Sequence, residues 1–223
     1  YSACASFNES LIILSNLIDS KKIKNGLALT SSHTEVSERQ FRYPIEYGSP
    51  RFKRSTMTAT GSVGVFLSTN GKIKVSKCTI GAAVNYHQTD VNNMGAVMAP
   101  AAAETLMNHL KVFKETQADY DLILTGDLGR VGSKLFLEIL KKNNLTLENY
   151  QDAGSLLFRE SDFHNAGSSG PVSLPLVLFG KIIPSKKYKK ILLLATGALH
   201  SQTLVNQHEE IPAISHAVSL EVL

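Results

Sequence analysis

The segment "YDLILTGDLGRVGSKLFLEILKKN" (120–143) decides the fold. It begins with a short apolar run that ends in Thr-Gly, which is typical of a buried strand, and from Val131 onward its apolar residues recur at helical spacing. The same alternation continues along the second part of the chain, where we predict helices over 98–115 and 170–183 and strands over 153–160, 189–197 and 215–223. Strands that alternate with helices of about 10 to 15 residues predict an α/β fold with a mixed sheet.

The N-terminal part opens with "YSACASFNESLIILSNLIDS" (1–20), a turn of small residues around Cys4 followed by apolar residues at helical spacing. Strands are predicted over 26–32, 63–69 and 72–81, and the Asn70-Gly71 pair predicts a hairpin between the last two. A cysteine at a helix start is normally held by a strand in front of it. We therefore expect that a front portion of the domain is missing here.

Composition excludes several classes of protein. Hydrophobic residues make up 43% of the 223 residues and charged residues 19%, with a mean hydropathy of -0.02, as in an ordinary globular protein. No run approaches the roughly 18 to 20 apolar residues of a membrane-spanning helix. Two cysteines cannot form a disulfide framework, and the seven histidines show no metal-ligand spacing, so no metal site is predicted.

The net charge of +4 and the isoelectric point near 9.0 come largely from "KKIK" (21–24) and "KKYKK" (186–190). These lysines are either solvated loop residues or a surface for anionic lipid headgroups, near which each lysine contributes about 1 kcal/mol. Tyr188 is the one aromatic residue in these clusters, and no nucleic-acid motif accompanies them, so we predict no nucleic-acid partner.

A long segment, 31–62, separates the first two predicted strands. It contains two prolines, many hydroxyl side chains and several arginines. Because a loop of this length inside a compact domain is usually functional or disordered, we interpret it as an excursion over the face where a ligand binds.

Cys4 is the sharpest chemical feature of the sequence. A thiol in the first turn of a helix lies near the positive end of the helix dipole, which lowers its pKa and favours a nucleophilic thiolate. The small neighbours Ser2, Ala3, Ala5 and Ser6 are equally compatible with a buried residue that only fills the turn.

Three other stretches contain candidate polar groups, each with a structural alternative. In "FHNAGSSGPVSLPL" (163–176), His164 and Asn165 precede a helix start that can bind an anion, or are loop residues. After the strand 120–126, Arg130 can clamp a carboxylate, or it pairs with an Asp127 that caps the next helix. Asp90, Asn92 and Asn93 are turn and cap residues, or face a ligand.

Seven stretches together resemble the stage V sporulation protein AD family, thiolase-fold proteins of endospore-forming bacteria. They are "YSACASFNESL", "TSSHTEVSERQFRYPIEYG", "TDVNNMGAVMAPAAAETL", "YDLILTGDLGRVG", "HNAGSSG", "LLLATGAL" and "IPAISHAVSLE". The resemblance implies two related halves, each a mixed five-stranded sheet with layered helices (α/β/α/β/α). Residues 1–70 would be the remainder of an incomplete first half and 71–223 the second half.

The resemblance further implies a non-enzymatic, dipicolinic acid binding component of the SpoVA complex, which loads that compound into the developing spore. Its partners would be dipicolinic acid and other SpoVA membrane proteins, with peripheral association at the forespore or spore inner membrane, no transmembrane segment and a homodimer through the strand after Gly61. Calcium would be present only together with dipicolinate, and no other cofactor is implied.

Residue by residue, Cys4 matches the nucleophile of condensing enzymes of this superfamily. Where ketoacyl synthases of the third type have a catalytic His, this chain has Gly126 and Asp127, which implies lapsed catalysis. The alternative function is an acyltransferase or β-ketoacyl-synthase-like condensing enzyme that uses Cys4. The resemblance implies that Tyr43 or Tyr47 stacks on the pyridine ring, and that Asp90 or Asp127 is the available oxygen ligand for calcium. The expected ligand-binding residues are Cys4, His33, Arg42, Tyr43, Asp90, Asn93, Asp127, Arg130, His164 and Asn165.

Overall fold

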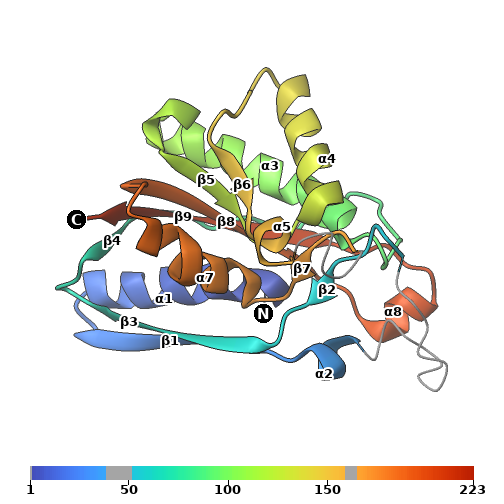
Figure 1. Cartoon of the computed structure of the whole chain (residues 1–223), viewed down its shortest axis with the longest axis horizontal. Coiled ribbons are helices and arrows are strands. Elements are labelled where there is room, and N and C mark those ends of the chain that lie inside the picture. Colours follow the sequence, from blue (N-terminus) through green and yellow to red (C-terminus); the bar gives the residue numbers. More distant parts are fainter. Residues whose placement is uncertain (1, 39–51, 159–164) are drawn as a thin grey trace.

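The computed structural model describes residues 2–38, 52–158 and 165–223, and a mixed five-stranded sheet forms its centre (Figure 1). The strand order is β4-β9-β8-β5-β6, in which β5 is parallel to β6 and β8, and β9 is antiparallel to β8 and β4. This confirms the predicted α/β class and mixed sheet. The strands are β4 (Ile73–Thr79), β5 (Leu122–Thr125), β6 (Tyr150–Asp152), β8 (Lys190–Ala198) and β9 (Ala213–Val222).

The central strand β8 shows why this sheet is covered on both faces. Successive side chains of a strand point to opposite faces, and here Ile191 and Leu193 enter one apolar core while Leu192 and Leu194 enter the other. All four are fully buried. The apolar side chains on both faces of this strand are therefore buried, each face by its own layer of helices.

The two helical layers lie on opposite faces of the sheet (Figure 1). On one face α1 and α7 contribute Phe7, Leu11 and Val177 to the core, and on the other face α3 and α4 contribute Leu106 and Phe136. The helices are α1 (Ser6–Asp19), α3 (Met94–Phe113), α4 (Gly129–Lys142) and α7 (Ser173–Val177), which continues as a π-helical turn (Leu178–Ile182) and a 3-10 turn (Ile183–Ser185).

A second, two-stranded sheet packs on the outer side of α1 (Figure 1). Strands β1 (Asn25–Ser32) and β3 (Gly61–Ser68) are antiparallel over their whole lengths. Burial is one-sided, because Ala28 is buried on the helix side whereas Leu29 is 71% exposed and Phe66 is 66% exposed. The segment 26–32 is thus a strand as predicted, but it is not fully buried.

Two predictions of local structure are wrong. The Asn70-Gly71 pair does not form a hairpin, because β3 pairs with β1 and β4 pairs with β9, so residues 69–72 cross between the sheets. The predicted division at residue 70 falls in this crossing. The segment 153–160 does not begin as a strand, because Asp152 accepts a hydrogen bond from the Ser155 backbone N–H and caps a helix instead. That helix is α5 (Ala153–Leu157).

Short elements line the ends of the long strands. The parallel pair of β2 and β7 places the predicted excursion 31–62 beside the glycine-rich turn that follows residue 164. These elements are α2 (Thr34–Glu38), β2 (Met57–Thr58), β7 (Ser168–Ser169) and α8 (Gln202–Asn206), with the 3-10 turns Ala3–Ala5 and Gln117–Asp119.

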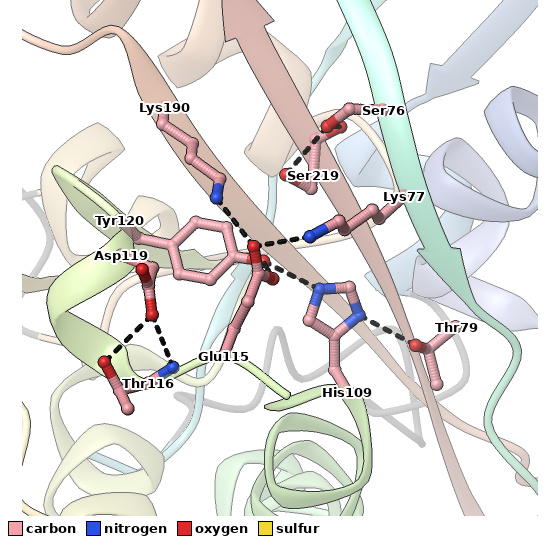
Figure 2. A network of polar contacts seen from close by, with 10 residues as sticks. All are labelled: Ser76, Lys77, Thr79, His109, Glu115, Thr116, Asp119, Tyr120, Lys190 and Ser219. Atoms are coloured by element: carbon pink, nitrogen blue, oxygen red, sulfur yellow. Dashed lines mark hydrogen bonds and ion pairs between the residues drawn. The ribbon is translucent and has the colours of Figure 1, made fainter. Parts of the chain in front are cut away.

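A polar network anchors the end of α3 to the sheet (Figure 2). The Glu115 carboxylate accepts hydrogen bonds from Lys77 at 2.5 Å, Lys190 at 2.7 Å and the Tyr120 hydroxyl at 2.6 Å. Burial alone would raise the pKa of Glu115, but these three donors outweigh it and lower the pKa to about 2. The carboxylate therefore stays charged at any physiological pH.

His109 completes this network in its neutral form. Because the Tyr120 hydroxyl donates to Glu115, the His109 Nε2–H must donate to Tyr120, and Nδ1 accepts from Thr79. Burial lowers the pKa of His109 to about 4. The network thus connects α3, β4 and β8, and its one charged acidic group is the Glu115 carboxylate.

In the described part of the chain, no helix is both long enough and apolar enough to cross a lipid bilayer.

Candidate functional site

A cavity of roughly 370 Å³ opens where β1, β5 and β8 end. The carboxyl ends of strands and the loops that follow them are the usual place for ligand sites in α/β proteins. Cys4 lies in this cavity, together with residues of the 31–62 excursion and of the turn after residue 164. The lining residues are Ala3, Cys4, Ser31, Ser32, Ser37, Thr56, Thr58, Met94, Met98, Asp127, Ser169, Gly170, Pro171, Ala198 and His200.

The cysteine turn is held against β8 by close backbone contact. Cys4 occupies the middle of the 3-10 turn that leads into α1, and the preceding Ala3 has a φ of 48°, which non-glycine residues rarely adopt. A Cβ atom added at Gly197 would lie 2.1 Å from the Ser2 carbonyl oxygen. Only a glycine in β8 therefore lets the turn approach this closely.

Ser2 connects this turn to β9. Its hydroxyl lies 3.0 Å from Nε2 of His216, whose Nδ1 accepts a hydrogen bond from the Gly81 backbone N–H. Because Nδ1 is the acceptor, the proton of the neutral ring is on Nε2, which donates to Ser2. Burial lowers the pKa of His216 and keeps the ring neutral, so this contact positions the turn without adding charge to the cavity.

Asp127 is the acidic group beside the cysteine. It follows β5, accepts hydrogen bonds from the Thr196 hydroxyl at 2.8 Å and the Gly170 backbone N–H at 3.2 Å, and also accepts one from the Cys4 thiol. Sequence reasoning placed Asp127 where related enzymes have a catalytic His. The structure brings the two predicted residues, Cys4 and Asp127, into direct contact.

The pKa of the Cys4 thiol is raised well above its ordinary value, so the predicted thiolate at a helix start is wrong. Burial is the largest cause, and the negative charge and hydrogen bond of Asp127 add to it. The Gly170 backbone N–H lowers the pKa but does not compensate. Burial, with the added charge of Asp127 from a distant part of the chain, thus outweighs the position of the thiol at a helix start, and the thiol stays protonated.

The pKa of Asp127 is itself raised to about 7, chiefly by burial. Hydrogen bonds from Thr196 and Cys4 favour the charged form, while the charge of nearby Asp152 disfavours it. Asp152 is also buried, and it accepts from Leu128, Gly129 and Ser155 at the starts of α4 and α5. Asp127 can therefore gain or lose a proton near neutral pH.

Other residues of the cavity lining carry less charge than Asp127. Met94 and Met98 come from the start of α3, and His200 follows β8, where burial lowers its pKa. The Thr56 side chain is only 2% exposed, and its Oγ1 atom has no hydrogen-bond partner among the described residues. A buried hydroxyl without a partner is costly in a folded protein.

Arg130 and Asn165 bond to backbone groups, and for Asn165 this matches the loop-residue alternative. The Arg130 guanidinium donates to the backbone carbonyls of Phe158 and Asn165. The Asn165 side chain accepts from the Gly167 N–H at 2.9 Å within its own turn. Neither residue lines the cavity. The predicted Asp127 cap is also wrong, because α4 has Leu128 at its cap position and Asp127 bonds to Thr196 and Gly170.

The remaining residues predicted to bind the ligand either do not line the cavity or lie outside the residues that the structure describes. Asp90 pairs with Arg54 at 2.9 Å, Asn93 caps α3 by accepting from Ala96, and His33 is exposed. For Asp90 and Asn93 the turn-and-cap interpretation is therefore the correct one. Arg42, Tyr43, Tyr47 and His164 lie outside the described residues.

Within residues 2–38, 52–158 and 165–223, no group of three or more His, Cys, Asp and Glu side chains is arranged to hold a metal ion. Of the two carboxylates expected to bind calcium, Asp90 is paired with Arg54 and Asp127 bonds to Thr196, Gly170 and Cys4.

Sequence reasoning missed His200, Thr56 and Ser169 as cavity residues. His200 had a usable signal, because it follows the buried strand β8 two residues after its end at Ala198, in the same way that Asp127 follows the end of β5 at Thr125. Thr56 and Ser169 had none, because they enter the cavity only through the short parallel pairing of β2 with β7.

Solved structures of other proteins share this fold. The 3-oxoacyl-[acyl-carrier-protein] synthase III of Aquifex aeolicus superposes with a TM-score of 0.60 at 15% identity, over 98% of this chain and 65% of that chain. OleA of Xanthomonas campestris with bound lauric acid and lauroyl-CoA gives 0.62 at 14% identity, over 97% and 64%. At these identities the likeness shows the fold alone, which is thiolase-like.

Sequence comparison gives a closer relationship. The family described as stage V sporulation protein AD matches residues 1–221. Stage V sporulation protein AD of Bacillus subtilis (strain 168) is 40% identical over 226 residues, which covers 99% of this chain and 67% of that protein. The chain thus spans about two thirds of the length of the proteins it matches. It belongs to the stage V sporulation protein AD family.

Proposed function

We propose that this chain binds dipicolinic acid, pyridine-2,6-dicarboxylic acid, as the solute-binding component of a spore membrane assembly, on a thiolase-like fold that no longer catalyses condensation. The observation that carries the proposal is the contact between Cys4 and Asp127, which both line a cavity of roughly 370 Å³. The cavity is present, but the cysteine at the nucleophile position, Cys4, lies beside the acidic side chain of Asp127.

Loss of catalysis follows from the chemistry of this contact. A cysteine nucleophile needs a base that removes its proton, or surroundings that stabilise the thiolate. Here burial and the Asp127 carboxylate both raise the pKa of the Cys4 thiol. A charged Asp127 can accept the thiol proton, but the thiolate would then remain in buried surroundings that disfavour its charge, and a protonated Asp127 cannot accept that proton. The raised pKa of the Cys4 thiol therefore supports the proposal that acyl transfer to Cys4 has lapsed.

The other cavity residues suit a small, flat, oxygen-rich ligand. Thr56 Oγ1 offers a hydrogen bond that no described residue uses, and Ser31, Ser169 and Thr58 add hydroxyls around the same space. The thioethers of Met94 and Met98 form an apolar wall, and sulfur packs favourably against aromatic rings.

The described lining residues include no Lys or Arg. Partial protonation of Asp127 near pH 7 reduces the negative charge that a dianion meets in the cavity.

Isothermal titration calorimetry with dipicolinate tests the proposal, with and without calcium. Thr56→Val keeps the side-chain shape and removes the hydroxyl, so we expect about tenfold weaker binding from the loss of one hydrogen bond to a charged group. Ala198→Phe fills the cavity and should abolish binding. Thr146→Val, an exposed loop substitution, is the matched control and should bind as the parent does.

Absence of heat at millimolar dipicolinate would overturn the proposal, and so would unchanged binding by both cavity variants. Incubation with acyl-CoA followed by mass spectrometry examines the competing enzyme function. A stable acyl adduct on Cys4 that is lost in Cys4→Ser would show that catalysis has not lapsed.

A further inference from the structure

Three loops at the end of the molecule opposite the cavity carry seven exposed lysines. The loops are 20–24 between α1 and β1, 69–72 between β3 and β4, and 184–189 before β8. None of the three contains an acidic residue. We call these side chains the lysine face, which consists of Lys21, Lys22, Lys24, Lys72, Lys186, Lys187 and Lys189.

Strand pairing brings the three loops together. Asn25, which follows the first loop, pairs with Ser68, which precedes the second. At the end of β9, the Leu223 N–H donates to the Lys72 carbonyl and the Val222 N–H donates to the Lys189 carbonyl. In Figure 1 the end of α1, the turn between β3 and β4 and the C terminus of the chain lie on one side, whereas β2, α2 and α8 lie on the other.

The positive charge of this face is largely uncompensated. None of its seven lysines forms an ion pair with another described residue. The neighbouring Asp121 carboxylate accepts the backbone N–H groups of Lys189 and Lys190, and Asp19 ends α1. The chain has 23 basic and 19 acidic side chains. Without these seven lysines the acidic ones would be in excess, so the net charge of the protein is concentrated here.

We propose that the lysine face docks on an anionic lipid surface, independently of what the cavity binds. Lysines on loops are flexible, strongly hydrated point charges, which suit a fluid layer of headgroup phosphates rather than one fixed geometry. The centres of protein interfaces are depleted in lysine and enriched in aromatic residues and arginine. These loops contain no arginine, and their one aromatic residue, Tyr188, is half-buried with its hydroxyl bonded to Gln151.

Vesicle sedimentation with the whole chain tests this inference. The protein should pellet with vesicles of 30% phosphatidylglycerol in phosphatidylcholine, and stay in the supernatant with phosphatidylcholine alone. Each lysine near such a surface changes affinity about fivefold, so the variant Lys186→Gln, Lys187→Gln, Lys189→Gln should bind roughly a hundredfold more weakly. Raising the salt concentration should release the parent protein, because exposed charges are screened.

A matched control changes three exposed lysines of α4, namely Lys134, Lys141 and Lys142, to Gln and loses the same charge. It should keep most of the vesicle binding. Equal loss in the control would overturn the inference, as would no preference for phosphatidylglycerol, or tight binding to an acidic protein or nucleic acid with none to vesicles. If the first variant does not fold, Lys21→Gln, Lys22→Gln, Lys24→Gln repeats the test in a different loop.

Discussion

Replacement of Glu115 by Gln should destabilise the protein by an amount that depends on pH in a defined way. The pKa of Glu115 falls from 4.5 to about 2 in the folded state. A difference of about 2.5 pH units corresponds to about 3.4 kcal/mol, at about 1.4 kcal/mol per unit. The Glu115 side chain is 9% exposed, but its partners Lys77 and Lys190 are 30% and 27% exposed. Solvent screening at these lysines reduces the expected loss to about 1.5 to 2 kcal/mol.

The sign of the pH dependence follows from the lowered pKa. A carboxylate whose pKa is lower in the folded state contributes its full stabilisation above about pH 4.5, the unfolded value, and loses it as the pH falls towards about 2. The Gln variant should therefore be less stable than the parent at pH 7, and the difference should shrink steadily below pH 4.5.

Urea denaturation followed by circular dichroism at pH 7, 4 and 3 measures this difference. Glu138→Gln, on the exposed face of α4, removes one carboxylate without a network and should stay within about 0.5 kcal/mol of the parent. The reasoning is refuted if the Glu115 variant lies within that same range at pH 7. A loss of equal size at pH 7 and pH 3 would also refute it, because packing rather than charge would then be responsible.

Three further outcomes are expected. Cys4 should react with iodoacetamide at pH 8 much more slowly than a free cysteine, because its pKa is raised, and Asp127→Asn should speed the reaction; peptide mass spectrometry gives both rates, and fast alkylation of the parent would contradict the burial argument. Gly197→Ala should lower the melting temperature severely or prevent folding, because its Cβ would lie 2.1 Å from the Ser2 carbonyl, whereas Gly180→Ala, with nothing within 4 Å, should be neutral or slightly stabilising. Dipicolinate affinity should fall as the pH rises from 6 to 8, because Asp127 with its pKa of about 7 becomes an anion; calorimetry at both values decides this, and Asp127→Asn should bind with little dependence on pH.

The strands and helices that the sequence predicted correctly are those with a strong local pattern. In the segment 120–143 the apolar run of β5 and the amphipathic repeat of α4 depend only on neighbouring residues. The Asn70-Gly71 signal was misleading because turn residues do not determine which strands pair, and β4 takes its partner from the far end of the chain. The apolar run after Asp152 resembled a strand because a single capping carboxylate gives little signal in sequence.

The candidate site was predictable in part for the same reason. Cys4 and Asp127 each stand at the end of a recognisable element, and the structure brings them together. Their ionisation was not predictable, because it depends on burial and on the approach of two segments that are distant in sequence. Arg130 looked suited to a carboxylate ligand, yet backbone carbonyls of Phe158 and Asn165 occupy it, and such carbonyls are invisible in a sequence pattern.

The direction of β8 fixes how far apart the two ends of the molecule are. This strand has nine residues, from Lys190 beside the lysine face to Ala198 in the cavity wall. At about 3.3 Å per residue it spans roughly 30 Å, comparable to the hydrocarbon thickness of a bilayer. A molecule that rests on the lipid headgroups by its lysine face would hold its cavity about that distance above them, at the end turned away from the membrane. A solute that moves between this cavity and a transmembrane pore would have to be transferred by a protein that extends over this distance, or would diffuse through the intervening water.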